Sequence, residues 1–127
     1  MNKTLWLASL LGIGAVMEIP VGLGLVALPS PLASVLLGAP LSGAGLVVAR
    51  IGGGALLALG IACWFARSTP TIRASLGVAG ALLTYNIVAC VALALAPGSR
   101  ALALGVAALH GLMAAGLLGA LVVRDRQ

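Results

Sequence analysis

The sequence predicts an all-α fold: an integral membrane four-helix bundle with a short surface helix in its first loop. Of the 127 residues, 62% are hydrophobic and only 7% are charged, whereas soluble domains have about 25% charged residues. Four apolar stretches each reach the roughly 20 residues that a helix needs to cross a bilayer core of about 30 Å. So few polar groups cannot cover the surface of a small water-soluble domain. The composition therefore excludes a soluble globular protein, a disordered chain and a disulfide-stapled secreted domain.

The expected spans form one transmembrane domain over residues 1–127, at about residues 5–28, 44–66, 74–96 and 101–123. Helices are expected because a helix satisfies its own backbone in lipid, and because the polar alternation of barrel strands is missing from these stretches. The first stretch is longer than the roughly 7–15 apolar residues of a signal peptide. We therefore expect it to be a retained helix.

Turn signals separate the spans and make neighbouring helices antiparallel. Ser68-Thr69-Pro70 predicts a helix cap followed by proline at the first helical position. The Ala-Pro-Gly-Ser sequence of residues 96–99 predicts the end of the third span and the cap of the fourth. The longer first loop, residues 29–43, holds a start signal at Ser30-Pro31 and a stop signal at Gly38. Its uncharged segment 31–37 predicts a short helix at the membrane surface or folded over the bundle.

The basic residues indicate orientation rather than nucleic-acid binding. The net charge is +5, but aromatic residues are only 3% of the chain, so no basic patch with interleaved aromatics exists. Cytoplasmic ends of membrane helices carry an excess of Lys and Arg. In a four-span arrangement five basic residues fall on one side and one on the other, which predicts cytoplasmic termini and a cytoplasmic second loop: Lys3, Arg67, Arg73, Arg124 and Arg126 against Arg100.

Small residues recur at four-residue spacing in the second and fourth spans, which predicts packing faces. Such stripes let helices approach closely in lipid. With 18 glycines in the chain, part of this pattern also arises by chance. The fourth-span stripe is expected to pack inside the bundle, against a second copy in a homo-oligomer, or against a larger membrane complex. Its members are Ala103, Ala107, Gly111, Ala115 and Gly119, and those of the second span are Gly54, Ala58, Ala62 and Ala66.

Each expected span carries one strongly polar residue in the half away from the predicted cytoplasmic side: Glu18, Arg50, Asn86 and His110. A lone charge at the bilayer centre costs at least about 2.5–3.5 kcal/mol. Glu18 and Arg50 have opposite charges, so we expect a buried ion pair between them. Asn86 and His110 are expected either to accept the remaining guanidinium donors or to bond each other. Tyr85 lies about 100° around the helix from Asn86 and need not face the same site.

Two interpretations of these four ligand or proton site candidates remain open. They hold the helices in register, since helices in lipid have little hydrophobic driving force to associate, or they line a ligand pocket or proton path. A histidine, which titrates near neutral pH, favours the second. The expected function is therefore a non-enzymatic membrane protein that binds or passes a small polar ligand or proton. The alternatives are an accessory or assembly subunit of a larger membrane complex, and a quinone- or redox-linked membrane component.

No cofactor or metal is expected. His110, Cys63, Cys90 and Glu18 have no metal-ligand spacing, and no phosphate-binding loop is found. The two cysteines lie at depths roughly 20 Å apart, far beyond the 7 Å or so of a disulfide, so free thiols are expected. Glu18 and Asp125 are the only carboxylates, which disfavours a Ser–His–acid triad.

The segment from Val48 to Arg67, VARIGGGALLALGIACWFAR, is followed by LLTYNIVA and by a histidine in the last span. Over most of its length the chain resembles small uncharacterised four-helix bacterial membrane proteins and is loosely similar to the DoxX-like group. The resemblance implies four helices in a bacterial inner (plasma) membrane. It also draws attention to Arg50, Trp64, Asn86 and His110 without assigning them a role.

Overall fold

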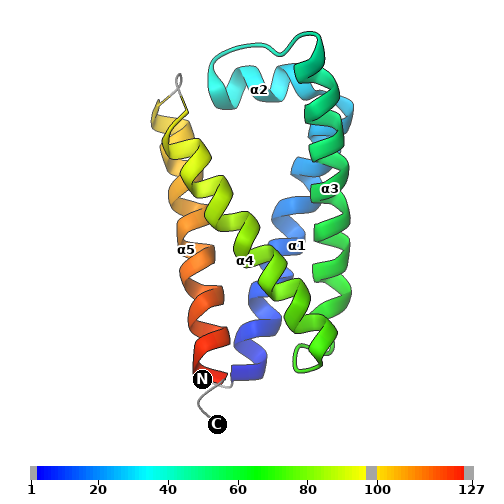
Figure 1. Ribbon diagram of the computed structural model, residues 1–127, viewed down its shortest axis with the longest axis vertical. Coiled ribbons are helices and arrows are strands. Elements are labelled where there is room, and N and C mark those ends of the chain that lie inside the picture. Colours follow the sequence, from blue (N-terminus) through cyan, green and yellow to red (C-terminus); the bar gives the residue numbers. More distant parts are fainter. Residues whose placement is uncertain (1–2, 97–99, 125–127) are drawn as a thin grey trace.

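The computed structural model describes residues 3–96 and 100–124. Within these ranges the chain forms five helices and no strand, so the predicted all-α bundle is confirmed (Figure 1). The four long helices match the four predicted spans closely, and the short second helix matches the one predicted in the first loop. The helices are α1 (Lys3–Ala27), α2 (Pro29–Leu37), α3 (Ala44–Ala66), α4 (Arg73–Ala94) and α5 (Arg100–Arg124).

Helices α1, α3, α4 and α5 are each long and apolar enough to cross a membrane. The shortest of them, α4, has 22 residues and is therefore about 33 Å long, slightly more than a bilayer core of about 30 Å. The protein is accordingly a multi-pass integral membrane protein whose outer side chains contact lipid.

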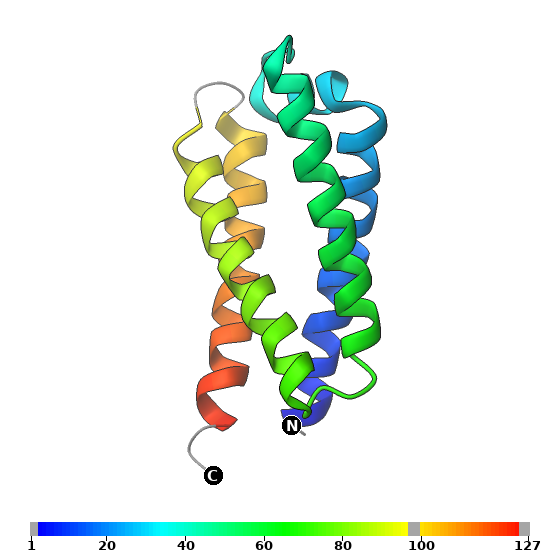
Figure 2. The same ribbon diagram turned by 45° about the vertical axis from the view of Figure 1, so that its right-hand side comes forward.

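The long helices form two pairs, α1 with α3 and α4 with α5. Helix α4 runs from beside α5 at one end of the bundle toward α3 at the other, so it links the pairs (Figures 1 and 2). Helix α1 begins and α5 ends at the end that carries the loop between α3 and α4, which we call the α3–α4 end. Helix α2 covers the opposite end, which we call the α2 end.

Proline and glycine define α2. The helix begins at Pro29, two residues before the predicted start, because Pro29 and Pro31 both fit its first turn. Gly38 ends it in the left-handed conformation, with φ of 76°, as the stop signal predicted. The Ser30 hydroxyl then accepts a hydrogen bond of 3.1 Å from the backbone N–H of Leu41. Buried Pro29 and Ala33 hold the helix against the bundle.

The predicted cap at residues 68–70 is wrong. The backbone N–H groups of Ser68 and Thr69 donate to the carbonyls of Phe65 and Ala66, so this segment extends the last turn of α3 instead of opening α4. Helix α4 begins only at Arg73, without a side-chain cap. In the third loop, α4 ends at Ala94, and residues 97–99 of the predicted turn lie outside the described residues.

A tight apolar core fills the α3–α4 half of the bundle. Its largest members are fully buried leucines, one each from α1, α4 and α5: Leu11, Leu82 and Leu117. Toward the α2 end, α1 and α3 meet through glycine instead. A Cβ atom built on Gly53 would lie 2.8 Å from the carbonyl oxygen of Gly22, which only a glycine–glycine approach permits.

The four-residue stripes follow these contacts only in part. Ala107 is buried and Gly111 half-buried, but Ala115 and Gly119 are exposed. The reason is geometric, since residues four apart advance about 40° around a helix at each step and leave the packed face. On α3, Gly54 and Ala58 are exposed, and the contact with α1 uses Gly53 and Gly60 instead.

Candidate functional site

Three polar side chains from three helices are buried at one level of the bundle. Glu18 of α1, Asn86 of α4 and His110 of α5 are 2%, 1% and 6% exposed. Each lies some eight to ten residues from the α2 end of its helix, which places it about 12–15 Å inside the span. The site is therefore near the middle of a bilayer core of about 30 Å.

The local sequence explains why these groups face inward. Asn86 continues the buried stripe of α4, which has the helical spacing of Ser75, Ala79 and Leu82. His110 continues the buried stripe of α5, between Ala107 and Met113. Both polar residues thus occupy positions that apolar residues fill in the rest of the stripe, directly above the leucine core.

Asn86 and His110 bond each other, which is one of the two arrangements expected from the sequence. His110 Nδ1 lies 2.9 Å from Asn86 Oδ1. The amide Nδ2 of Asn86 donates to the Leu82 carbonyl at 2.8 Å, so its oxygen must be the atom that faces the histidine. An acceptor at 2.9 Å requires hydrogen on Nδ1. The neutral imidazole is therefore the Nδ1–H tautomer, with the Nε2 lone pair left to accept a proton.

Tyr85 joins the site through both its hydroxyl and its ring. The hydroxyl is hydrogen-bonded to the carboxyl group of Glu18. The ring meets that of His110 edge to face, with centroids 5.5 Å apart and an interplanar angle of 87°. One residue thus connects Glu18 on α1 with His110 on α5.

The sequence did not require Tyr85 to face the site, because neighbouring residues point about 100° apart on a helix. The packed face of a bundle helix is itself at least about 100° wide, however, and two adjacent residues can border one partner. His110 lies in that position, against the Asn86 amide and the Tyr85 ring. The sequence could have pointed to Tyr85, because it is the single tyrosine of the chain and is adjacent to the candidate site residue Asn86.

Arg50 does not take part. Its side chain is exposed on α3, and no ion pair joins it to Glu18 among the described residues. Arg50 lies ten residues, about 15 Å, nearer the α2 end than Gly60, the α3 residue that packs against Glu18. The expected buried ion pair is therefore absent, and the Tyr85 hydroxyl bonds Glu18 instead. Helix α3 instead meets Glu18 with a glycine, since a Cβ atom on Gly60 would lie 3.3 Å from the Glu18 Cβ.

The described residues contain no group of three His, Cys, Asp or Glu side chains placed to hold a metal ion. Cys63 and Cys90 are both free, as predicted. Comparison with protein family models, curated proteins and solved structures finds no match to this chain. Its function must therefore be argued from the chemistry of the site itself.

The geometry connects three titratable groups in series. The Glu18 carboxyl bonds the Tyr85 hydroxyl, the Tyr85 ring contacts the His110 ring, and the His110 Nδ1 donates to Asn86. A carboxyl group and an imidazole can each take up and release a proton, while the phenol and the amide hold them in place.

Proposed function

We propose that the protein binds or passes a proton at the middle of the membrane, through a cluster formed by Glu18, Tyr85, Asn86 and His110. The observation that supports this most directly is the buried Glu18–Tyr85–His110 series. Buried ionisable groups in membrane spans are costly, and ion or proton pathways are a common reason for them. No basic residue in the described part of the chain neutralises Glu18, so a proton is the natural counter-charge.

The contacts favour a proton over a larger polar ligand. The Glu18 carboxyl and the Asn86 and His110 side chains already bond partners within the cluster. A small polar molecule that bound the same atoms would have to break at least one of these hydrogen bonds, whereas a proton can be gained or lost while the heavy atoms stay in contact. Breaking such a buried hydrogen bond costs about 1–3 kcal/mol for each polar group that is left without a partner.

The chain offers an unusually direct test, because it contains one His, one Tyr and, besides Asp125, one carboxylate residue, Glu18. Isotope labelling by amino-acid type therefore reports each member of the cluster separately. With ¹³C-labelled glutamate and ¹⁵N-labelled histidine, we expect the Glu18 carboxyl signal to change between its protonated and ionised forms as the pH is varied. The His110 nitrogens should follow over the same interval, and in the neutral ring Nδ1 should carry the hydrogen.

Tyr85→Phe keeps the ring contact with His110 and removes the hydroxyl that bonds Glu18, so it should uncouple the two signals. Thr84→Val is the matched control, since it removes an exposed hydroxyl one residue away that bonds only the Gly80 carbonyl. A Glu18 signal that stays constant throughout the pH range of the folded protein would refute the proposal. The accessory-subunit alternative, which exposed Arg50 favours as a partner contact, would then replace it.

We further infer that both termini lie in the cytoplasm of a bacterium, with α2 on the outer side of the inner membrane. The support is the five-to-one distribution of Lys and Arg that the sequence predicts for the loops and termini on the two sides of the membrane, together with the resemblance to bacterial four-helix proteins. Reporter fusions after residues 36 and 98 should therefore be external, and those after residues 70 and 127 cytoplasmic. An external carboxyl-terminal reporter would overturn this orientation.

A further inference from the structure

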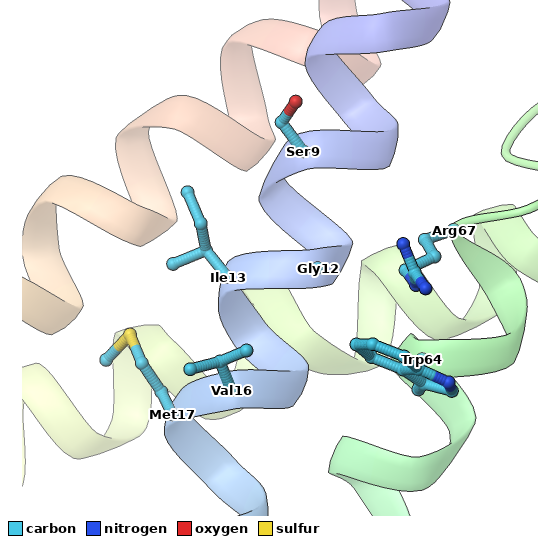
Figure 3. A pocket seen from close by; sticks show the side chains of 7 residues that line it. All are labelled: Ser9, Gly12, Ile13, Val16, Met17, Trp64 and Arg67. Atoms are coloured by element: carbon cyan, nitrogen blue, oxygen red, sulfur yellow. The ribbon is translucent and has the colours of Figure 1, made fainter.

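A groove runs along the outer surface of the α1–α3 pair, starting at the α3–α4 end. Its first part has a volume of about 410 Å³ and is lined by Trp64 of α3, by Arg67 just after that helix, and by the α1 residues Gly12 and Val16 (Figure 3). Its second part, of about 310 Å³, shares Trp64 and continues past Ile19, Ile61 and Phe65. Apart from Arg67 and Ser9 at its start, the groove is lined by apolar side chains and Gly12.

The cation at the start of the groove is held in place. The Arg67 guanidinium lies 3.7 Å from the centre of the Trp64 ring, a distance typical of a cation–π contact. The side chain reaches across α1 at Gly12, where an added Cβ atom would be 3.8 Å from the Arg67 Cδ. Stacking on an aromatic face leaves the N–H groups at the edge of the guanidinium free to bind an oxyanion in a bidentate manner.

Arg67 has no anionic partner within the described residues. The single carboxyl group there belongs to Glu18, which bonds Tyr85 in the interior. Arg67 directly follows the last residue of α3, and long basic side chains near helix ends can reach toward the headgroups. The start of the groove therefore offers a positive charge that has no anionic partner among the described residues, on a long side chain beside the end of α3.

The length of the groove matches one leaflet. From Ser9 to Ile19 it extends over ten residues of α1, about 15 Å at the helical rise. Half of a bilayer core of about 30 Å has the same depth. Arg67 lies at the level of Gly12, so an acyl chain that follows the groove from Arg67 passes seven residues of α1, about 10 Å, and reaches Ile19 beside Glu18.

We propose that the α1–α3 groove is a binding site for one anionic glycerophospholipid of the leaflet at the α3–α4 end. Its phosphate binds the Arg67 guanidinium, and one acyl chain lies along Trp64, Val16, Ile61 and Phe65. Charge complementarity selects a lipid over an apolar helix from a partner, because a helix surface that fits these apolar walls would leave Arg67 without an anion.

The two tryptophans of the chain, Trp6 and Trp64, allow the groove to be observed by fluorescence. In a Trp6→Phe background the remaining emission comes from Trp64, which lines both parts of the groove. Quenching is then measured in bilayers in which phosphatidylglycerol or phosphatidylcholine carries brominated acyl chains. We expect phosphatidylglycerol to occupy the groove about fivefold more strongly, the preference that one basic residue near a membrane surface provides.

Variants of Arg67 distinguish a specific lipid site from a general attraction of anionic lipids to the basic end of the protein. Arg67→Gln should abolish the preference for phosphatidylglycerol, and Arg67→Lys should keep part of it. Arg73→Gln removes the same charge from an exposed position at the same end of the bundle and should leave the preference unchanged. Equal loss in the Arg67 and Arg73 variants would overturn the proposal in favour of non-specific surface charge, as would equal quenching by both lipids in the parent protein.

A second pair of variants tests the apolar walls and does not depend on Arg67. Val16→Phe narrows the groove from a side chain that is 66% exposed, and Val88→Phe makes the same change at a 60% exposed position on α4. Val16→Phe should reduce the preference for phosphatidylglycerol, and Val88→Phe should not. If Val16→Phe leaves the preference intact, the acyl chain does not lie in the groove and the proposal fails.

Discussion

Replacing Gly53 by alanine should prevent α1 and α3 from packing and raise the unfolded fraction sharply, because the added methyl group has no space. The new Cβ atom would lie 2.7 Å from the Leu25 Cβ, 2.8 Å from the Gly22 carbonyl oxygen and 2.9 Å from the Val26 nitrogen. Two of these atoms belong to the backbone, so no change of side-chain rotamer relieves the contact. Overpacking of a core costs about 1–3 kcal/mol, and we expect about 3 kcal/mol or more at this position.

The same helix provides the control for this prediction. A Cβ atom on Gly54 would meet nothing within 4 Å, and alanine is the better helix former by about 1 kcal/mol. Gly54→Ala should therefore be neutral or slightly stabilising. The free energy of unfolding of both variants can be measured by titration with a denaturing detergent in mixed micelles. If Gly53→Ala unfolds at the same midpoint as Gly54→Ala, α1 and α3 do not approach each other as described.

Leu117→Ala should be the most damaging truncation on α5. Leu117 is fully buried in the core of the α3–α4 half, whereas its neighbour Leu118 is 52% exposed. Truncation of a buried leucine in a soluble core costs about 2–5 kcal/mol. In a membrane protein the unfolded helices remain in lipid, so lost packing rather than transfer from water dominates. We expect about 2 kcal/mol for Leu117→Ala and well under 1 kcal/mol for Leu118→Ala.

Thermal unfolding of the two alanine variants in the same detergent provides the measurement. Both variants have the same composition and the same change in helix propensity, so any difference between them reports packing. Equal melting temperatures for the two variants would show that the α3–α4 half is not the close-packed part of the bundle.

The fold was readable from the sequence because the bilayer sets the length of each helix. Four apolar stretches of bilayer length leave little choice of architecture, and the observed helices end within three residues of the predicted spans. The cap at Ser68 and Thr69 was predicted wrongly because the backbone of these residues completes the last turn of α3. A sequence pattern cannot reveal which of two adjoining helices uses a capping residue.

The site was only partly readable, and the reason is the uniform hydrophobicity of the helices. Depth along the membrane follows approximately from counting residues, which places Glu18, Asn86 and His110 at one level. The count fails for Arg50, because α3 begins beyond the end of α1 at the α2 end. Direction around the helix normally follows from a polar face opposite an apolar one, and these helices are apolar on every side. The exposed position of Arg50 and the inward position of Tyr85 therefore became clear only from the packing.

The hydrogen bond between Glu18 and Tyr85 joins the two helix pairs of the bundle. Glu18 belongs to the α1–α3 pair, while Tyr85, Asn86 and His110 belong to the α4–α5 pair. Below this level the leucine core joins the pairs firmly. If the two helix pairs separate at the α2 end, they must rotate about that core. The hydrogen bond between Glu18 and Tyr85 must then lengthen or break. Glu18 lies seven residues of α1, about 10 Å, beyond Leu11 of that core, so its hydrogen bond joins the two pairs at a level where the leucine core no longer does.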